Sequence, residues 1–515
     1  MSNLPQTLAH IPAFYAERTP DAAAMICEDR TLSFAQLNDN TARIAAWLLE
    51  RNVAEGERVG ILDKNSERYI EASLGIMRAR AVLVAVNYRL AVDEMEFIIK
   101  DAGVRVLFVG SEFLEAGKVL AERLNLTLQV IEDLDADIHS AGAAPAIDDS
   151  AVNAGDDALQ LYTSGTTGLP KGVRSQHSAM LQFLGAAVDA GWADYGAAGD
   201  DAKVLIVMPM YHVAGFNATI FSIAQGLPAL IHREVNPDAI FDAIENDQVT
   251  DTLLVPAVIQ MLVQHPRAET TDFSNLRSLT YGASPIPEPV LLAAQRIIGC
   301  SFIHVYGMTE NQGGGTYLPP EGHAVELGKF RSVGKAYKGA EVRVVDPDGR
   351  DLGPGEVGEV LMRSSWLMRS YWNRPEASEE TLAGGWLHSG DAGYFDEDGY
   401  LYIHDRVKEM IISGGENIYP AEVESALHQH EDITDAAVVG VPDEKWGEVP
   451  LAFLVLREGV ELDAEALNAF LRDKIAGYKI PRSFELAEVL PRNASGKLLR
   501  RVLREPYWAD RDKPI

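Results

Sequence analysis

Short extended runs alternate with amphipathic stretches along the first three quarters of the chain. Runs rich in Val, Ile and Leu, such as Arg58–Leu62 and Ser301–Val305, are separated by stretches with helical spacing, such as Phe34–Leu49 and Glu67–Arg80. Strands that alternate with helices form βαβ units, whose strands lie parallel in one sheet. This alternation predicts an α/β fold built on mainly parallel sheets.

The pattern changes twice toward the C-terminus. Between Gly334 and Tyr402, short extended runs are separated by Pro-Asp-Gly, Gly-Pro-Gly and Glu-Asp-Gly turns, which is typical of antiparallel strands. After Asp405, Pro420 stands where a helix can begin, and further strand and helix patterns follow. We therefore expect an N-terminal domain over residues 1–405, with a β subdomain at about 334–402, and a separate α+β domain over 406–515.

Composition excludes several classes of protein. The 515 residues are 47% hydrophobic and 23% charged, as in ordinary globular proteins. The net charge of −31 opposes binding to nucleic acid or to an anionic membrane. No apolar run reaches the roughly 18 residues of a membrane-spanning helix, no signal-peptide pattern is visible, and two cysteines are too few for a disulfide framework. We expect a cytoplasmic protein with no nucleic-acid partner and no stable membrane insertion.

The segment from Leu161 to Gly172, LYTSGTTGLPKG, has the composition of a phosphate-binding loop. Its hydroxyl side chains, its exposed backbone N–H groups and the Lys171 cation are the groups that bind a polyphosphate. Pro170 stands where a Walker loop would need glycine, so the loop is of another kind. A merely flexible polar loop is the alternative interpretation.

A second segment, Tyr306-Gly-Met-Thr-Glu310, follows the extended run Ser301–Val305. At the carboxyl end of a parallel strand it would lie where open α/β sheets bind ligands. It offers an aromatic face for a purine, a hydroxyl for a phosphate oxygen and a carboxylate of the kind that Mg²⁺ prefers. Taken alone, the string also fits a simple strand end followed by a turn.

Further motifs follow in order along the chain: YGASP at 281–285, GWLHSGD at 385–391, DRVKEMI at 405–411, SGGENI at 413–418 and PRNASGK at 491–497. Together with the two segments above, they resemble, over essentially the whole chain, the adenylate-forming superfamily of acyl-CoA synthetases, firefly luciferases and peptide-synthetase adenylation domains. The resemblance implies a large N-terminal domain of two mainly parallel α/β sheets plus a β-barrel-like subdomain, with a small mobile α+β C-terminal domain. It also implies ATP, Mg²⁺ and coenzyme A as cofactors, and a monomer or homodimer.

The resemblance assigns roles in nucleotide binding. It places Tyr306 against adenine, Thr309 at the α-phosphate, Glu310 on Mg²⁺, and Asp391 on the ribose hydroxyls with Arg406 beside it. Without the resemblance, Asp391 would be interpreted as a capping residue in the turn after Ser389-Gly390. The other residues that it implies for ATP and coenzyme A are Thr163, Ser164, Gly165, Thr166, Thr167, Lys171, Ala283, Ser284, Pro285, Gly414 and Gly415.

The resemblance also assigns a mobile lysine and a hinge. Lys497 lies in a basic segment of an acidic protein, which alone would fit a solvated helix face. In the family, this lysine stabilises the transition state of adenylate formation. The small domain then rotates about Lys408, which removes Lys497 and brings in Gly414 and Gly415 to line a pantetheine tunnel.

Three residues are expected in the substrate pocket. A lone histidine such as His212, which follows an apolar run, is more often structural, but similar acyl- and aryl-CoA synthetases use this position at the acyl site. Gly282 and Gly307 complete the expected set. Acetyl-specific relatives have a bulky Trp where Gly307 stands, which indicates an acid larger than acetate.

The expected activity is that of an acid–CoA ligase, which joins a small-molecule carboxylic acid to coenzyme A with ATP. A medium- or long-chain fatty acid is favoured, and an aryl acid such as a hydroxycinnamate comes next. The segment Tyr211–Phe216 holds no Asp to anchor an amino acid, and little sequence follows Lys497, which favours coenzyme A as acceptor. Amide-forming, carrier-protein-loading or luciferase-like chemistry remains open, as does a non-catalytic nucleotide-binding regulator, which would be expected to have lost Lys497, Glu310 or Asp391.

Overall fold

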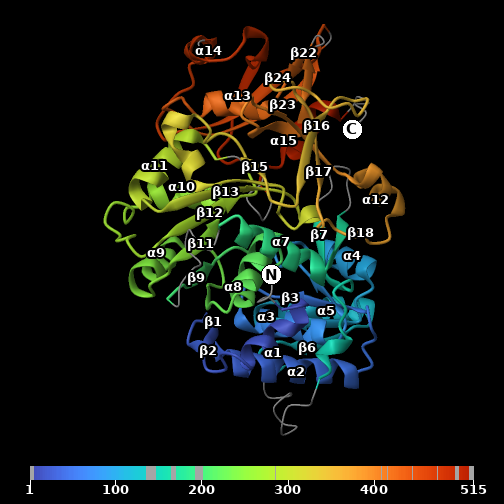
Figure 1. Cartoon of the computed structure of the whole chain (residues 1–515). Coiled ribbons are helices and arrows are strands. Elements are labelled where there is room, and N and C mark those ends of the chain that lie inside the picture. The colour runs from blue at the N-terminus through green and yellow to red at the C-terminus, as the bar shows by residue number, and fades with distance from the viewer. Residues whose placement is uncertain are drawn as a thin grey trace.

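The computed structural model describes residues 5–134, 147–163, 170–191, 201–284, 286–406, 409–413, 416–443, 445–472, 474–492 and 498–509. Two large sheets with helices packed on their faces form the lower and middle parts of the molecule in Figure 1. The strands at the centre of each sheet are parallel, and antiparallel strands stand only toward the sheet ends. The expected α/β fold class is confirmed.

One sheet has nine strands in the order β15-β14-β13-β12-β11-β9-β10-β1-β2. Helices α9, α10 and α11 pack on one face around Leu279, Tyr281 and Phe302, while α7 and α8 lie on the opposite side. The strands are β1 (Ala23–Cys27), β2 (Arg30–Ser33), β9 (Val204–Ile206), β10 (Ala229–Ile231), β11 (Asp251–Leu254), β12 (Ser278–Gly282), β13 (Ser301–Tyr306), β14 (Thr316–Leu318) and β15 (Lys335–Ala336). The helices are α7 (His177–Asp189), α8 (Val213–Ala224), α9 (Pro237–Asn246), α10 (Pro256–Gln264) and α11 (Glu288–Ile298).

The other sheet has seven strands in the order β18-β8-β7-β4-β3-β5-β6. Its central strands, such as Val82–Ala85, are buried throughout, because helices cover both faces. The strands are β3 (Arg58–Leu62), β4 (Val82–Ala85), β5 (Val106–Val109), β6 (Thr127–Val130), β7 (Asp157–Thr163), β8 (Lys171–Gln176) and β18 (Ser370–Tyr371). The helices that precede this sheet in the chain or cover its faces are α1 (Ile11–Ala16), α2 (Phe34–Glu50), α3 (Glu67–Arg78), α4 (Val92–Ala102) and α5 (Leu114–Leu124).

The expected antiparallel subdomain is a four-stranded sheet in the order β16-β17-β19-β20. Its strands are β16 (Glu341–Val345), β17 (Gly358–Arg363), β19 (Leu387–Phe395) and β20 (Leu401–Arg406), and helix α12 (Pro375–Thr381) precedes β19.

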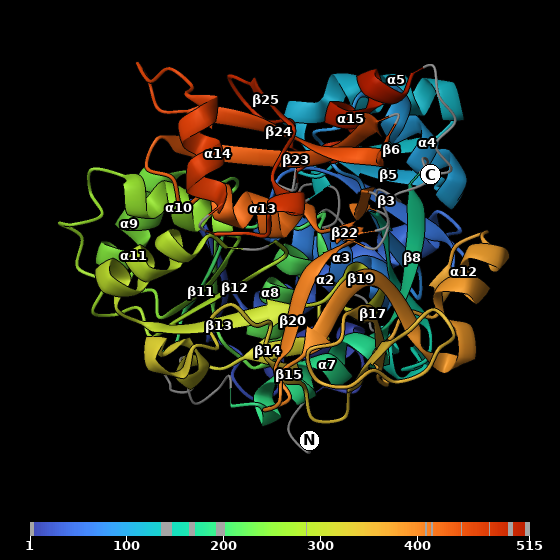
Figure 2. The same cartoon turned by 90° about the horizontal axis from the view of Figure 1, so that it is seen from above.

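The remaining elements lie at the top of Figure 1, and Figure 2 shows the long antiparallel pair β23 and β24 at their centre. These elements are β21 (Ile411–Ser413), β22 (Glu416–Ile418), α13 (Pro420–Leu427), β23 (Ile433–Asp443), β24 (Gly447–Leu456), α14 (Ala464–Arg472), β25 (Ser483–Leu486) and α15 (Arg500–Trp508). The domain boundary at residues 405 and 406 stays a prediction.

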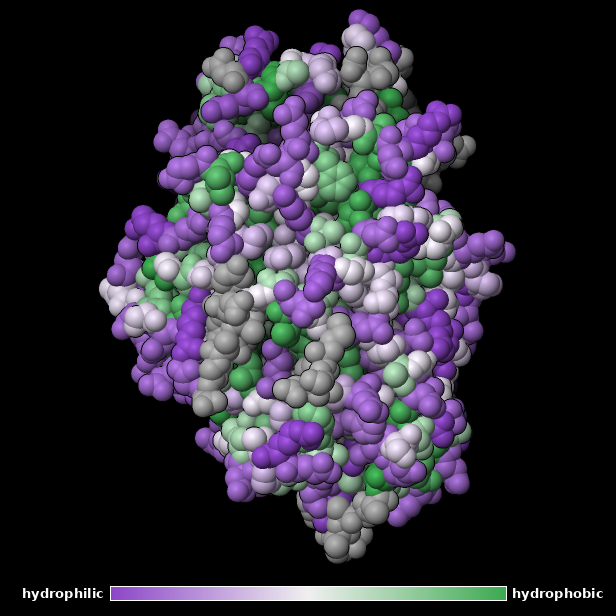
Figure 3. All heavy atoms as spheres, in the orientation of Figure 1, coloured by the Kyte–Doolittle hydropathy of each residue, from purple (hydrophilic) through white to green (hydrophobic). Residues whose placement is uncertain are grey.

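The visible surface is mostly polar. On the face in Figure 3, hydrophobic residues are scattered among hydrophilic ones. Within the described part of the chain, no helix combines the length and the apolar character needed to cross a membrane.

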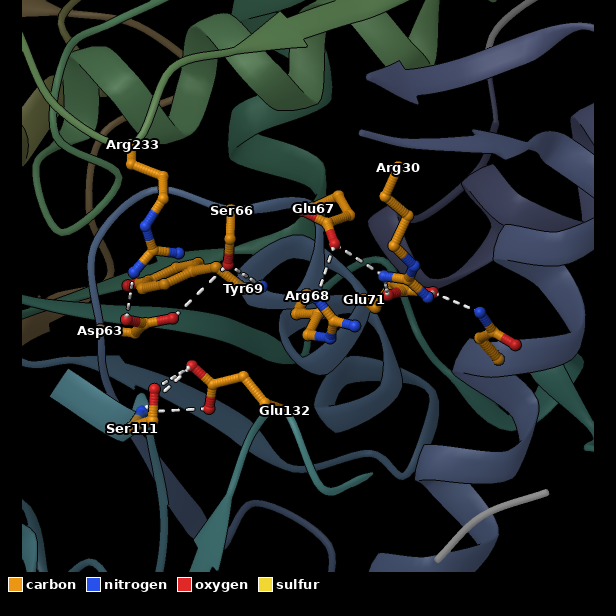
Figure 4. Close-up of polar contacts among 11 residues, drawn as sticks. Arg30, Asp63, Ser66, Glu67, Arg68, Tyr69, Glu71, Ser111, Glu132 and Arg233 are labelled. Atoms are coloured by element: carbon orange, nitrogen blue, oxygen red, sulfur yellow. Dashed lines mark hydrogen bonds and ion pairs between the residues drawn. The ribbon is translucent and has the colours of Figure 1, made fainter. Parts of the chain in front are cut away.

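A network of buried charges joins the two large sheets. Arg30, at the start of β2 in the nine-stranded sheet, donates to Glu67 (2.8 Å) and Glu71 (2.7 Å) on α3, which packs on the seven-stranded sheet. Asn40 of α2 also donates to Glu71 (2.5 Å). Figure 4 shows Arg30 pointing toward both carboxylates. Because Glu67 and Glu71 are each only 2% exposed, Arg30 supplies the positive charge that makes their burial tolerable.

Asn65 makes a second connection, directly after β3. Its side-chain amide donates to the backbone oxygens of Met208 (3.0 Å) and His232 (3.2 Å), and its oxygen accepts from the N–H of Met210 (2.8 Å). Met208 and His232 follow β9 and β10 of the other sheet, so this buried amide ties the carboxyl ends of strands from both sheets together. An ion pair between Asp63 and Arg233 (3.6 Å) lies at the same junction (Figure 4).

Replacing Arg30 tests the charge network. Arg30→Met leaves Glu67 and Glu71 buried with less positive charge, so we expect the free energy of unfolding to fall by about 3 kcal/mol. Arg296→Met is the matched control, since Arg296 pairs with Glu269 where both side chains are about two-thirds exposed, and it should change stability by less than about 1 kcal/mol. The measurement is urea unfolding followed by fluorescence, and equal effects of the two variants would contradict a structural role for the network.

Candidate active site

The ends of the phosphate loop are held by two paired strands. Thr163, the last residue of β7, is the register partner of Lys171, the first residue of β8. A Cβ added at Gly172 would lie 2.7 Å from the Gln160 side chain and 3.0 Å from the Tyr162 ring, so a larger residue here would have to displace the Gln160 amide. Ser164, Gly165, Thr166 and Thr167 lie outside the described residues.

Glu310 is brought to the loop by a residue that the sequence did not single out. The Tyr371 hydroxyl donates to a carboxylate oxygen of Glu310 (2.6 Å), and the Lys171 ammonium lies 5.0 Å from the centre of the Tyr371 ring. Tyr371 belongs to β18, which pairs with β8, whereas Glu310 follows β13 of the other sheet. One tyrosine therefore joins the predicted phosphate-binding lysine to the predicted metal ligand.

The donor set around Glu310 fits Mg²⁺. This ion is usually held by one or two carboxylates together with phosphate oxygens, rather than by a cage of protein ligands. Glu310 is only 5% exposed and offers hard oxygen donors beside Tyr371, whose ring also contacts Lys171. Among the described residues, no group of three or more His, Cys, Asp or Glu could hold a metal on its own. When bound, Mg²⁺ would supply neutralisation of phosphate charge.

Tyr306 and Asp391 meet from different sheets. The Tyr306 hydroxyl donates to Asp391 (2.6 Å), so the predicted adenine-binding ring and the predicted ribose-binding carboxylate are neighbours. The expectation that Asp391 lies in a turn is wrong, because it lies within β19. Gly390 has φ +68° at an irregularity in the pairing of β17 with β19, so the Ser-Gly pair marks a kink inside a strand. The backbone of Arg406 pairs in register with Asp391, and the role of Arg406 in nucleotide binding stays a prediction.

The YGASP motif begins in β12 and leaves the sheet at its carboxyl end. Gly282 is the last residue of the strand, and a Cβ added there would meet the Val305 carbonyl oxygen at 2.3 Å. Ala283 has φ +69°, a conformation that non-glycine residues adopt rarely and that often marks a functional turn. Ser284 follows in the same turn, and Pro285 lies outside the described residues.

A cavity of about 160 Å³ opens beside these residues, far more than the roughly 10–15 Å³ that one water needs. Its floor is one face of the nine-stranded sheet, where mostly alternate residues of three adjacent strands line it, together with Thr252. In register across the sheet, the rows run from Asp251 and Ser278, through Leu253, Thr280 and Ile303, to Gly282 and Val305, and Val255 lines the cavity directly after β11. The cavity therefore follows the strands from their amino ends to the nucleotide-side residues Gly282, Ala283 and Gly307.

Helices α7 and α8 wall this cavity. They contribute mainly apolar and small side chains, with the amide of Asn217 near the nucleotide side and polar groups again at the end of α8: Phe183, Leu184, Ala187, Val188, Val213, Ala214, Asn217, Ala218, Phe221, Ser222 and Gln225. An apolar body with few polar groups is the usual composition of a small-molecule site. We call this space the acyl cavity.

His212 lies beside the acyl cavity but is not among its lining residues. It precedes the first residue of α8, and its ring lies 4.6 Å from that of Tyr211. Burial lowers the pKa of His212 to about 4, so the imidazole is neutral at physiological pH. Its Nε2 is buried without a hydrogen-bond partner among the described residues, and its role at the acyl site stays a prediction.

The structure changes the interpretation of Gly307. The glycine does line the acyl cavity, yet a Cβ added there would lie 2.3 Å from the backbone carbon of Gly313 and 2.8 Å from the backbone nitrogen of Gly314. A larger residue would therefore displace the backbone before it filled the cavity. Gly307 is required by the close approach of two chain segments, whatever the size of the acid.

Lys408, Gly414, Gly415 and Lys497 lie outside the described residues. Tyr371 and Asn65 are the positioning residues that sequence reasoning missed, since neither belongs to a motif and each acts through a partner distant in the chain.

Comparisons with known proteins identify the family of this chain. The model of the AMP-binding enzyme family matches residues 13–372, and that of the AMP-binding enzyme C-terminal domain matches 422–497. The fatty acid–[acyl-carrier-protein] ligase ScoC of Streptomyces coeruleorubidus is 38% identical, over 99% of this chain and 98% of that protein. A feruloyl-CoA synthase of Amycolatopsis is 36% identical, over 98% and 99%.

Solved structures show the same likeness. The o-succinylbenzoate CoA synthetase of Bacillus subtilis, in complex with its acyl-adenylate intermediate, has a TM-score of 0.86 and 32% identity, over 96% of this chain and 97% of that one. The same enzyme has also been solved with ATP and magnesium ion, with a TM-score of 0.85. The fold and site thus define an adenylate-forming acid–thiol ligase. The chain belongs to the family of AMP-binding enzymes.

Removing the Tyr371 hydroxyl tests its link to Glu310. A hydrogen bond to a charged group is worth about 1.5–3 kcal/mol, so Tyr371→Phe should lower kcat/KM for ATP about tenfold or more and raise the Mg²⁺ concentration needed for half-maximal rate. Tyr507→Phe is the matched control, because Tyr507 donates to Glu485 over the same 2.6 Å on the exposed surface. An unchanged Mg²⁺ dependence in Tyr371→Phe would show that the hydroxyl does not position Glu310.

Proposed function

We propose that this protein is an acid–CoA ligase that makes an acyl-adenylate from a carboxylic acid and Mg·ATP, and then an acyl-CoA thioester. In the first step, a carboxylate oxygen attacks the α-phosphorus and pyrophosphate leaves. In the second, the coenzyme A sulfur attacks the acyl carbon and AMP leaves with the bonding electrons. Adenylation makes the second step feasible, because AMP is a far better leaving group than the oxide of a free carboxylate.

The observation that carries this proposal is the opening of one cavity at the predicted nucleotide site. Gly282, Ala283 and Gly307 line the acyl cavity and belong to the two motifs that the resemblance assigns to ATP. A carboxylate at this end of the cavity would lie beside the phosphates, with Lys171 and Glu310 joined through Tyr371. The protein's contribution is positioning and neutralisation of charge.

The acid is proposed to be longer than acetate. The cavity floor spans four residue steps of β12, from Ser278 to Gly282, or about 13 Å at the rise of a β-strand. That length suits a medium-chain acyl group or an aryl acid of the size of a hydroxycinnamate better than a two-carbon acid. The long-chain fatty acids that the sequence favoured would need more length than this floor provides.

The acceptor is proposed to be coenzyme A, reached after the C-terminal domain rotates about Lys408. A carrier protein is the second candidate, because ScoC, 38% identical, is named as a ligase that loads an acyl carrier protein. Both acceptors present the thiol of a pantetheine arm, so either can follow the same first step. Competition between free coenzyme A and a pantetheinylated carrier protein distinguishes them.

The half-reactions can be tested separately with Lys497→Ala. ATP–pyrophosphate exchange should depend on added acid, and the variant should reduce that exchange by roughly 10²-fold or more, because the lysine is proposed to stabilise charge in the adenylation transition state. Thioester formation from a supplied acyl-adenylate should be nearly retained. Lys474→Ala removes a cation from the same domain and should leave exchange unchanged, whereas equal losses of both half-reactions in Lys497→Ala would contradict the assigned role.

Ala218 offers a cleaner test of acid length than Gly307. It lines the acyl cavity from α8, so Ala218→Phe places a ring in the cavity instead of against the backbone. We expect kcat/KM for medium-length or aryl acids to fall at least tenfold, with propionate affected little. Gln182→Phe, on the exposed side of α7, is the control. A parallel loss for short and long acids would show that Ala218 supports the fold and not the acid.

A further inference from the structure

The amino-terminal end of the acyl cavity floor carries a buried carboxylate. Asp251 and Ser278 are register partners on β11 and β12, and both line the cavity. Asp251 is 7% exposed and accepts hydrogen bonds from the hydroxyls of Ser278 (2.5 Å) and Thr250 (2.6 Å). This end lies about a strand length from Gly282, where the carboxylate of the acid is proposed to react.

Asp251 is not neutralised by a protein cation. No ion pair within 4 Å joins it to any residue that the structure describes, and Arg277, which acts on it at longer range, pairs with Asp201 at the surface. A carboxylate has about four acceptor positions, of which the two hydroxyls use two. Burial raises the pKa of Asp251, and the hydrogen bonds from Ser278 and Thr250 oppose that rise. A buried carboxylate with unused acceptor positions is stabilised by one more hydrogen-bond donor.

Other polar groups gather at the same end. Ser222 lies in the last turn of α8 and Gln225 directly follows the helix, which begins at the carboxyl ends of the strands and runs back toward their amino ends. Between this end and the nucleotide site the lining is mainly apolar, with Leu253, Ile303 and Phe221 beside the hydroxyl residues Thr252 and Thr280. The cavity thus matches a molecule with a carboxylate at one end, an apolar body and a polar group at the other.

We propose that the acid carries a hydrogen-bond donor, a hydroxyl or an amine, at the end far from its carboxylate, and that Asp251, positioned by Ser278, binds that donor. The inference rests on the proposed function and narrows its substrate class. A plain fatty acid would place a methyl group against the buried carboxylate of Asp251. The hydrogen-bonding capacity of that carboxylate would then stay unused, which weakens binding strongly in a polar site.

The experiment compares acids of equal length that differ only at the far end. Wild-type protein is assayed for acid-dependent ATP–pyrophosphate exchange with medium-chain acids ending in a methyl, a hydroxyl or an amine, and with cinnamate against para-hydroxycinnamate. We expect kcat/KM for at least one donor-bearing acid to exceed that of its methyl or unsubstituted counterpart by about tenfold or more. Preference for the amine over the hydroxyl would identify a cationic ligand group, and the reverse a neutral one.

Substitution then locates the preference. Asp251→Asn should reduce the ratio of donor-bearing to plain acid at least several-fold, and most for an amine, whereas Asp251→Leu should invert it. Ser278→Ala should lower the same ratio less, and Asp201→Asn, which removes an exposed acidic group of the same region, should leave it unchanged. Because the readout is a ratio within each variant, partial loss of folded protein does not imitate the effect.

Two outcomes separate this inference from the proposed function. If the plain acids support exchange as well as the donor-bearing ones do, or if Asp251→Asn leaves the ratio unchanged, Asp251 only accepts bonds from its neighbours and the inference is overturned. If no acid supports exchange with wild-type protein, the proposed function itself fails and the inference fails with it.

Discussion

Two parallel sheets can share one active site only if the carboxyl ends of their strands are held against each other. Buried polar groups hold the strand ends together here, because hydrogen bonds are directional whereas apolar packing is not. The Asn65 amide satisfies three backbone groups after β9 and β10, and the Asp63–Arg233 pair lies beside it. A buried donor or acceptor without a partner costs more free energy than a formed hydrogen bond contributes. These contacts therefore fix the relative placement of the sheets.

That placement has a chemical consequence at Tyr371. The phosphate loop belongs to the seven-stranded sheet and Glu310 follows a strand of the nine-stranded one, yet the tyrosine touches Lys171 with its ring and Glu310 with its hydroxyl. The Tyr306–Asp391 bond joins β13 to the antiparallel sheet in the same way. Groups that the family resemblance assigns to one nucleotide therefore come together from three sheets, and the floor of the nine-stranded sheet extends from them into the acyl cavity.

Much of the fold could be predicted from the sequence, because the patterns that indicate it are short contiguous motifs or periodicities that extend over long stretches. The alternation of extended and helical runs gave the strands at Arg58–Leu62 and Ser301–Tyr306 nearly to the residue. Asp391 was misplaced in a turn because Ser-Gly is a turn signal, and only strand pairing distinguishes a turn from a kink inside a strand. From the sequence alone Gly307 indicates only the size of the acid, because its close approach to Gly313 and Gly314 exists only in the folded chain.

The sequence by itself therefore determined the fold class and the family, and it predicted the nucleotide-binding residues, because periodicity and contiguous motifs depend on consecutive positions. Only the tertiary structure decided which of those residues meet. Tyr371 with Glu310, and Asp251 with Ser278 at the far end of the acyl cavity, are separated by tens of residues and joined by strand register and packing. The physical reason is that burial and hydrogen-bond partnership, which set the charge and polarity of a site, are properties of the folded chain.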